Sequence, residues 1–573
     1  MADAPHHDGS PLYLDDEQPA LGDQVGVWVR ASGAEVPDAI WVRTVEDAEP
    51  FYAPMRIEER ADRTEGVWWR GAVHVRNPVQ HYRFMLVHGD DYAWLNQSGV
   101  HAYDVPDAHD FVVSTFPAAP DWARDAVVYQ IFPDRFARSK AADDRPTPAW
   151  ARPARWDDPP IHQGPDTPLQ FYGGDLDGIV EHLDHIESLG ADTVYLTPVF
   201  PAESNHRYNA STFDEVDPLL GGNEAYRRLI DACHDRGLRI LGDLTSNHTG
   251  DTHEWFRTAA ADPTSLERAF YYFSPDGGHE GWKGVSTLPK LDHLDAELGR
   301  RLRHVVMRWL GFGLDGWRID VANMTGRHVE VDIAHRVARE IREAAVEVVP
   351  DASVVGEHGH DASGDLDGDG WHGTMNYYGF SFPVWEFVRR EDGPVPSFGL
   401  PVGVPRRPAT AALRSMREFT ARFGWRAVGQ SWNILGSHDT PRIRTVTGSA
   451  ALHEVAIALQ FTLPGVPMVF AGDEFGFEGV DGEDSRRTID WSTDPEMLAT
   501  YRRYADLRRG HIALRRGSLR WLHLGEDMAV YVREHSAGDV LVACSRGGTE
   551  AVTIDGHEIP GFADPGVHVA AIG

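Results

Sequence analysis

The 573-residue chain is poor in cysteine and in long hydrophobic runs. Its two cysteines, Cys233 and Cys544, lie far apart in the sequence, which suits a reducing compartment and gives no zinc-ligand spacing. No apolar stretch approaches the roughly 20 residues needed to cross a bilayer, and the first residues lack the basic start and apolar run of a secretion signal. We therefore expect a soluble, cytoplasmic protein without a membrane partner.

Positive charge is also scarce. The chain has 54 basic and 88 acidic residues, a formal net charge of -34, and its only lysines are Lys140, Lys283 and Lys290. Such a surface repels the phosphate backbone, so nucleic acid is not an expected partner. Hydrophobic residues make up 42% of the chain, which is ordinary for a globular protein with a large core.

Short β-rich runs dominate residues 22–113. Runs such as "QVGVWVR" and "GVWWRGAVHV" are separated by turn residues, a pattern typical of a small antiparallel sandwich. We assign residues 1–119 to this N-terminal β-sandwich. Its many tryptophans fit a sugar-binding platform or, as is more common in a sandwich, the core and an interface.

The sequence pattern changes after residue 119, where short apolar strands alternate with amphipathic helices. We expect strands in eight runs: "AVVYQIFP", "DTVYLTPVF", "LRILGDLT", "GWRIDV", "SVVGEH", "GTMNY", "SWNILGSHD" and "PMVFAGDE". Eight strands with helical crossovers predict an α/β protein with a closed (β/α)8 TIM barrel over residues 120–510. Residues 249–294, after the third strand, form an inserted subdomain, and residues 511–573 form a small C-terminal β domain.

Polar residues stand at the carboxyl ends of these strands, where barrel enzymes carry out their chemistry. The third strand ends in "GDLTSNH", the fourth carries Arg318 and Asp320, the fifth reaches Glu357, and the seventh ends in "GSHD", with His438 and Asp439. A lone aspartate at a strand end is more often a helix cap. Clustered carboxylates cost stability, which proteins tolerate mainly at functional sites, so the set predicts an active site.

Arg318 and Asp320 stand two residues apart in "DGWRIDVANM" and therefore share one face of their strand. A buried structural ion pair explains this spacing as well as chemistry does. The strand alone leaves both interpretations open.

In this order, "DLTSNH", "GWRIDVAN", "GEH" and "GSHD" resemble the four signature regions of the alpha-amylase superfamily of retaining glycosidases. The stretches "VVYQIFPDRF", "FYGGDLDGI", "NHRYNASTFDEVDP" and "LPKLD" are similar to its cyclomaltodextrinase, neopullulanase and maltogenic amylase branch. The resemblance spans roughly residues 125–491. The N-terminal sandwich also resembles the first domain of that branch.

The resemblance implies a role for each matching residue. Asp320 matches the nucleophile, Glu357 the general acid/base, and Asp439 the third carboxylate, which stabilises the transition state. We expect Arg318 to lower the pKa of Asp320, so that it stays charged, and the pKa of Glu357 to be raised. The positions implied to contact substrate are Tyr208, His248, Arg318, Asn323, Met324 and His438.

Two positions depart from the branch. Met324 stands where glutamate is common, and Gly359 stands where tryptophan is frequent. In the branch, both positions lie near the acceptor side of the site. The balance between hydrolysis and transfer, and the preference for bulky substrates, stay open.

No cofactor is required by this interpretation, although the resemblance raises the option of calcium. The Gly173 carbonyl and Asp175 in "FYGGD" match calcium ligands of the branch, but the partner loop "ARSKAADDRPTPAW" is unlike it. Calcium takes roughly six to eight oxygen ligands, and only these two can be named. A role for Asp175 as a helix cap fits the sequence equally well.

The resemblance implies a retaining hydrolase that cleaves α-1,4 bonds, with α-1,6 bonds as a further option, in short linear or cyclic malto-oligosaccharides. It also implies a homodimer in which the sandwich of one subunit helps to shape the active site of the other. One alternative is a transglycosylase or isomerase that uses the same covalent intermediate. A remote alternative is a non-catalytic carbohydrate-binding protein, which the complete set of carboxylates disfavours.

Overall fold

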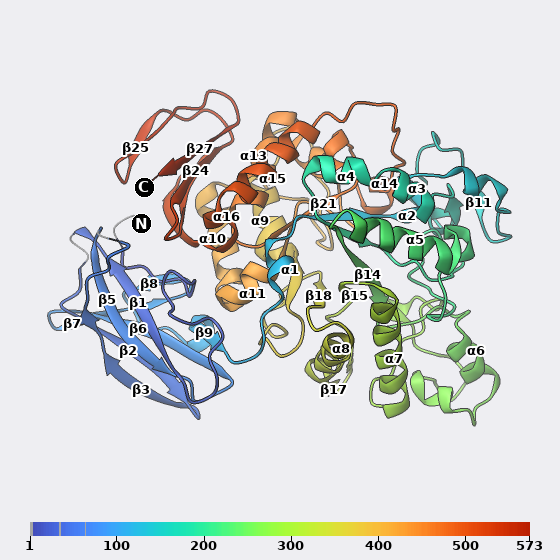
Figure 1. Ribbon diagram of the computed structural model, residues 1–573, viewed down its shortest axis with the longest axis horizontal. Coiled ribbons are helices and arrows are strands. Elements are labelled where there is room, and N and C mark those ends of the chain that lie inside the picture. The colour runs from blue at the N-terminus through green and yellow to red at the C-terminus, as the bar shows by residue number, and fades with distance from the viewer. Residues whose placement is uncertain (1–3, 34–35, 64, 573) are drawn as a thin grey trace.

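Eight parallel strands close into a barrel at the centre of the molecule (Figure 1). The computed structural model describes residues 4–33, 36–63 and 65–572. The strands follow chain order around the barrel: β10 (Val128–Ile131), β13 (Thr193–Leu196), β14 (Arg239–Thr245), β15 (Gly316–Asp320), β18 (Ser353–His358), β19 (Gly373–Asn376), β20 (Trp432–Ile434) and β21 (Val466–Phe470). All eight coincide with the runs predicted from the sequence, so the TIM-barrel prediction is confirmed.

The register of the barrel strands places their polar carboxyl ends at a similar height along the barrel axis. Thr245 of β14 lies opposite Asp320 of β15, and Glu357 of β18 lies opposite Met375 of β19. Every residue of β15 and β18 is buried, since the barrel interior covers one face and helices cover the other. Alternation along a strand then sends Arg318 and Asp320 to one side and Trp317 and Ile319 to the other.

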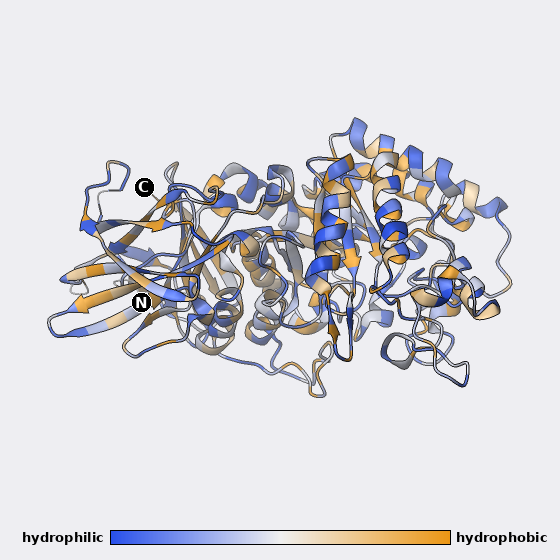
Figure 2. Cartoon of the chain, turned by 90° about the horizontal axis from the view of Figure 1, so that it is seen from below, coloured by the Kyte–Doolittle hydropathy of each residue, from blue (hydrophilic) through white to orange (hydrophobic). Residues whose placement is uncertain are grey.

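Amphipathic helices cover the outside of the barrel, and Figure 2 shows hydrophobic and hydrophilic colour alternating along them. In α5 the buried residues recur at helical spacing from Ala225 to Cys233. The principal helices are α3 (Leu176–Glu181), α4 (Leu183–Leu189), α5 (Gly222–Asp235), α7 (Ala296–Phe312), α8 (Ala334–Val348), α9 (Phe382–Val388), α10 (Ala409–Thr420), α11 (Gly424–Gln430), α13 (Ala450–Thr462) and α15 (Leu498–Gly510).

The stretch "DGIVEHLDHIESLG", predicted as one helix, is divided into α3 and α4. The break falls at His182, whose φ of -119° and ψ of 15° are not helical. The His182 ring stacks on Trp491, with 3.7 Å between ring centroids and 14° between planes. The partner in this stack is more than 300 residues away, so the local sequence could not reveal the break.

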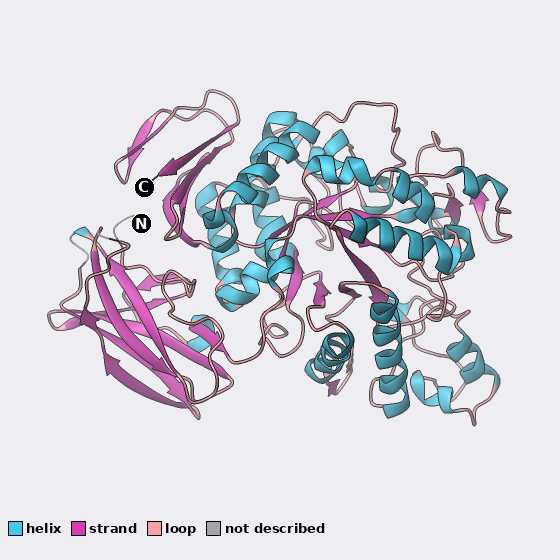
Figure 3. Ribbon diagram, viewed as in Figure 1, coloured by secondary structure: helices cyan, strands magenta, loops and turns pink. Residues whose placement is uncertain are grey.

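Antiparallel sheets flank the barrel, as Figure 3 shows, and this part of the fold prediction is confirmed. The N-terminal sheets are β1 (Gln24–Ala31), β5 (Val67–His74) and β4 (Arg56–Ile57), and β3 (Glu49–Pro54), β2 (Ala39–Glu46), β6 (Val79–His88), β7 (Asp91–Asn96), β8 (Gly99–His101) and β9 (Phe111–Ser114). At the other end of the chain, the sheet contains β22 (Ser518–Leu524), β23 (Met528–Glu534), β24 (Asp539–Ser545) and β27 (Gly566–Ile572).

The tryptophans of the N-terminal sheets divide between core and surface. Trp69 belongs to the hydrophobic core between the sheets, whereas 36% of Trp41 is exposed. The segment between β14 and α7 contains α6 (Glu254–Ala261) and extends beyond the barrel in Figure 1. Within the described residues, no helix has both the length and the hydropathy of a membrane span. Cys233 and Cys544 are buried free thiols.

Candidate active site

Arg318 is the centre of the predicted site. Its side chain is 0% exposed, and its Nη1 donates to Asp243 at 2.9 Å and to Asp320 at 2.9 Å. Its Nη2 forms an ion pair of 2.9 Å with Glu357 Oε2. Three carboxylates from three neighbouring strands therefore surround one guanidinium. Asp320 is therefore part of a larger cluster of carboxylates, whereas a structural ion pair with Arg318 would need only one carboxylate.

The pKa values of Asp320 and Glu357 are both raised. Burial raises the pKa of Asp320 well above its ordinary value, with Arg318 opposing and the negative charge of Glu357 adding to the rise. Burial also raises the pKa of Glu357, against the effect of Arg318. Arg318 lowers the pKa of Asp320, as expected, but burial outweighs the arginine and the net shift is upward. The two groups interact closely enough to titrate as a pair, so a single proton on the pair leaves one carboxylate charged.

Val321, directly after Asp320, has an unusual backbone conformation. Its φ is +45°, a region that a β-branched residue rarely adopts. In this conformation its N–H donates to Glu357 Oε2 at 2.9 Å. The backbone N–H that directly follows Asp320 thus holds the side chain of Glu357. No pattern in the sequence predicts this turn, because valine at this position is typical of an ordinary strand.

Tyr208 and His438 lie against each other on the neighbouring wall. The Tyr208 hydroxyl is 2.7 Å from His438 Nε2 and donates to Asp243 at 2.9 Å, and the two rings are stacked at 5.4 Å. His248 Nε2 lies 3.8 Å from Asp320 Oδ2. Burial lowers the pKa of both His248 and His438 to about 3, so both imidazoles are neutral at physiological pH. They are therefore suited to hydrogen bonding with uncharged groups.

Asp439 has a separate cationic partner, Arg486. Arg486 donates from Nη2 to Asp439 Oδ1 at 3.0 Å and from Nε to the His438 carbonyl at 2.8 Å. Burial raises the pKa of Asp439, but His438 and Arg486 together lower it further, and the net shift is downward. Asp439 is thus held ionised. Sequence reasoning missed Arg486, since nothing in "DSRRTID" tells which arginine turns toward a residue 47 positions earlier.

Asn323 and Met324 lie in the turn after β15, and both are partly buried. Their backbone carbonyls are held by cations: Arg327 donates to the Asn323 oxygen at 2.9 Å, and Lys290 donates to the Met324 oxygen at 3.2 Å. Lys290 also donates to Asn247 Oδ1 at 2.7 Å, and burial lowers its pKa to about 8. The sequence signal for this contact was the scarcity of lysine: Lys290 is one of only three lysines, and it stands within the "LPKLD" stretch.

The residues proposed for calcium do not fit a metal ion. Asp175 caps α3 by accepting from the Gly178 N–H at 3.0 Å, and its other oxygen accepts from Arg145 at 2.7 Å. Ser139 donates to both oxygens of Asp175, at 2.9 Å from its N–H and 2.6 Å from its hydroxyl. Arg138 lies 3.4 Å from the Gly173 carbonyl oxygen. Protein donors already use these oxygens, and guanidinium groups lie where a cation would have to be, so the helix-cap alternative describes Asp175.

The reactive carboxylates differ in how far substrate can reach them. The side chain of Asp320 is 8% exposed, that of Glu357 11%, and that of Asp439 29%. Each has a free edge at the mouth of the barrel, while Arg318 and Asp243 lie fully behind them. The arrangement offers one carboxylate held for attack, one able to carry a proton and one ionised partner, which is what glycoside cleavage needs.

Known proteins share this framework. A family model described as the catalytic domain of alpha amylase matches residues 130–512. Neopullulanase 2 of Thermoactinomyces vulgaris is 34% identical over 441 residues, which cover 74% of this chain and 70% of that protein. The ligand-bound structure of the cyclic α-maltosyl-(1→6)-maltose hydrolase from Arthrobacter globiformis is similar with a TM-score of 0.68 and 30% identity, over 79% of this chain and 99% of that one. A cyclomaltodextrinase structure is similar with a TM-score of 0.72 and 26% identity, over 97% of this chain and 93% of that one.

Proposed function

The chain belongs to the alpha-amylase family of glycoside hydrolases, and we propose that it cleaves α-1,4 bonds in short malto-oligosaccharides, linear or cyclic, with retention of configuration. One observation carries this proposal. The Arg318 guanidinium contacts both Asp320 and Glu357 at 2.9 Å, which joins a nucleophile and a proton donor through one cation.

In the first step, Asp320 attacks the anomeric carbon with Oδ2, the oxygen that Arg318 does not hold. Glu357 gives its proton to the departing glycosidic oxygen, and a covalent glycosyl ester forms on Asp320. Negative charge moves from Asp320 to Glu357 during this step. Because Arg318 contacts both groups, the charge stays beside the same cation throughout.

In the second step, Glu357 acts as a base. It takes a proton from a water molecule, whose oxygen attacks the anomeric carbon and releases Asp320. Two inversions give net retention. The Val321 N–H stabilises the ionised form of Glu357 between the two steps.

Asp439, His248, His438 and Tyr208 hold the sugar during both steps in this proposal. The ionised Asp439 accepts hydrogen bonds from ring hydroxyls, and these bonds strengthen as positive charge develops on the ring. The neutral histidines bind hydroxyls without adding a positive charge that would oppose the transition state. Tyr208 provides an aromatic surface, and Asn323 and Met324 border the acceptor side.

The size of the substrate is inferred from the relatives. The two similar structures belong to enzymes named for cyclic glucans, and the curated relative is named neopullulanase. We therefore propose small or cyclic α-glucans as substrates, with α-1,6 bonds as a second linkage. Starch should be a poorer substrate.

The experiment is an assay of the purified protein on maltotriose, β-cyclodextrin, panose, pullulan and starch, with products separated by size. Free reducing ends from cyclodextrin, panose or maltotriose would support the proposal. Longer or rearranged glycosides would instead identify a transglycosylase or isomerase. The Glu357→Gln variant is the control, and no turnover of any α-glucan by folded wild type would contradict the proposal.

We further propose a homodimer in the cytoplasm. Trp41, Tyr52 and Tyr92, which are 36%, 48% and 41% exposed, lie on one face of the larger N-terminal sheet, and such a face suits a partner subunit. The free thiols of Cys233 and Cys544 suit a reducing compartment. Sedimentation of the wild type and of a Trp41→Ser, Tyr52→Ser variant tests the dimer: a monomer for the wild type would contradict it.

A further inference from the structure

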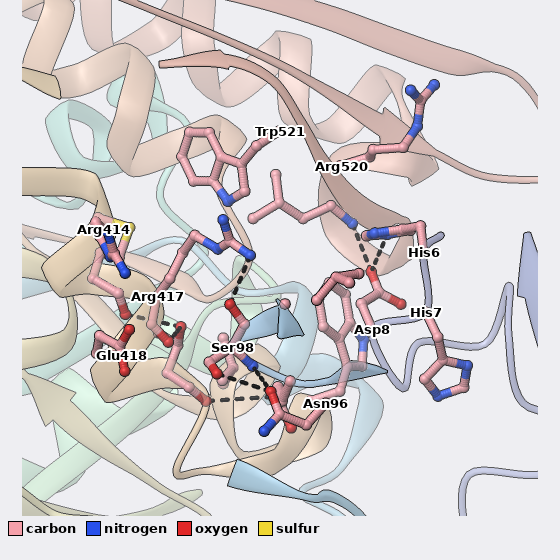
Figure 4. Close-up of a pocket in the computed structure, with 18 of the residues that line it drawn as sticks. His6, His7, Asp8, Asn96, Ser98, Arg414, Arg417, Glu418, Arg520 and Trp521 are labelled. Carbon is pink, nitrogen blue, oxygen red and sulfur yellow. Dashed lines mark hydrogen bonds and ion pairs between the residues drawn. The ribbon is translucent and has the colours of Figure 1, made fainter. Parts of the chain in front are cut away.

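A second cavity, of about 740 Å³, lies where the N-terminal sheets, the barrel helices and the C-terminal sheet meet (Figure 4). None of the active-site side chains described above lines it. Its walls come from the N-terminal segment 4–8, the β7–β8 hairpin, α10 and β22. This volume lies within the range of roughly 300–1,000 Å³ that is typical of small-molecule sites.

The cavity has more hydrogen-bond donors than acceptors among its unpartnered groups. The Arg414 side chain is exposed and makes no hydrogen bond or ion pair with any residue in the described ranges. Trp521 and Trp425 also line the cavity, and neither indole N–H has an acceptor within the part of the chain that the structure describes. An acceptor-rich ligand is needed to match these donors.

A second arginine, Arg417, lies on the same side as Arg414. Arg417 lies one helical turn after Arg414 on α10 and donates to the Ser98 carbonyl at 3.0 Å. Burial lowers the pKa of Arg417, Glu418 opposes this shift, and Arg414 adds to it. Figure 4 shows Arg414, Arg417 and Trp521 toward one side of the cavity and His6 and Asp8 toward the other.

Asp8 and Glu418 are acidic residues that also line the cavity. Asp8 accepts from the Ser10 N–H at 3.0 Å and from the Leu519 N–H at 2.8 Å. Glu418 lies 3.8 Å from His109. Neither carboxylate pairs with Arg414, so the cation remains available to a ligand.

A sugar ring would satisfy the other groups of the cavity. The Oε1 atom of Gln97 is buried and has no donor in the described residues. A sugar hydroxyl supplies such a donor, while the Trp521 indole gives a ring face and an N–H at its edge. A phosphate ion alone would fill only a small part of the cavity.

We propose that this cavity binds a phosphorylated monosaccharide. The phosphate is bound by Arg414, while Arg417, one helical turn further along α10, adds to the positive potential. The ring packs against Trp521, and a hydroxyl donates to Gln97 Oε1. Arginine is suited to this role because its planar guanidinium donates two parallel hydrogen bonds to phosphate oxygens. The site is independent of the proposed hydrolysis and joins three parts of the chain, so its occupation should stabilise their junction.

The test is titration calorimetry of the full-length protein with glucose 6-phosphate, together with thermal unfolding. We expect saturable binding at one site per chain and a Tm that rises with ligand concentration. Arg414→Gln should weaken binding at least about tenfold, since one charge-assisted interaction is lost. Arg422→Gln, an exposed arginine just beyond α10, is the matched control, and Asp320→Asn should bind like the wild type.

Four results would overturn the proposal. One is the absence of saturable binding at about 10 mM glucose 6-phosphate, and another is equal binding by Arg414→Gln and Arg422→Gln. The other two come from comparison of ligands. If glucose binds as tightly as glucose 6-phosphate, the ligand is not an anion, and if inorganic phosphate does, the ring is not recognised.

Discussion

Replacing Arg486 by glutamine should move the acidic limb of the pH–rate profile to higher pH. Arg486 Nη2 donates to Asp439 at 3.0 Å, and its side chain is only 7% exposed. With the guanidinium removed, burial raises the pKa of Asp439 with less opposition. Asp439 must be ionised to bind the sugar in the proposed mechanism, so activity should be lost earlier as the pH falls.

The expected size of this shift follows from a single contact. One hydrogen bond to a charged group contributes about 1.5–3 kcal/mol, and one pKa unit corresponds to 1.36 kcal/mol. The Asp439 side chain is 29% exposed, so solvent screens part of the interaction, and His438 still opposes the shift. We therefore expect the acidic limb to move up by about one pH unit, with a smaller loss at neutral pH.

The assay is kcat/KM for maltotriose between pH 4 and pH 8, because this ratio reports the pKa values of the free enzyme. Arg487→Gln is the matched control: this neighbouring arginine contacts Asp484 and the Glu478 carbonyl but not Asp439. Its acidic limb should coincide with that of the wild type. If Arg486→Gln also coincides with the wild type, the reasoning about Asp439 is refuted.

The remaining predictions concern three charged groups elsewhere in the chain: Asp320, Asp175 with Arg145, and His335. Asp320→Asn should lower kcat at least about 10⁴-fold, because it removes the nucleophile, and it should not lower Tm, because burial of the charged aspartate is costly. Activity assays and melting curves check this, and substantial turnover by the variant would contradict the assigned role. Chelation by EDTA should leave Tm unchanged, and a Tm that falls with EDTA would argue for bound metal. Arg145→Ala should lower the free energy of unfolding by about 3 kcal/mol, because Asp175 would keep a buried charge without its cation. The interaction with Asp369, whose Oδ1 lies 3.7 Å from His335 Nδ1, raises the pKa of His335 to about 9 against the effect of burial. The stability contributed by its proton is therefore complete below about pH 6.5 and is lost as the pH rises through about 9. The unfolding free energies of wild type and His335→Gln should differ at pH 6 and converge at pH 10, and an unchanged difference would contradict this.

The barrel and the identity of the polar cluster could be predicted from the sequence, because both depend on local pattern. Short apolar runs that alternate with amphipathic helices favour parallel strands whatever lies around them. Once the strands are parallel and closed, their carboxyl ends must meet, so Asp320, Glu357 and Asp439 are brought together by topology alone. Their separation in the sequence, up to 119 positions, is no obstacle to this inference.

Only the tertiary structure decided the pKa values and the long-range side-chain contacts, because these depend on what surrounds each residue and not on the local sequence pattern. The pKa of Asp320 rises because complete burial outweighs the neighbouring arginine, and burial is a property of the whole fold. Asp175 contacts Arg145 where the resemblance suggested a metal ion, Arg486 reaches Asp439, and His182 stacks on Trp491. Each of these contacts joins residues that are distant in the chain, and the short range of hydrogen bonds and van der Waals forces makes them depend on positions to within about an ångström. Residue order alone determines the topology of this protein, but only the packed structure determines its charges and contacts.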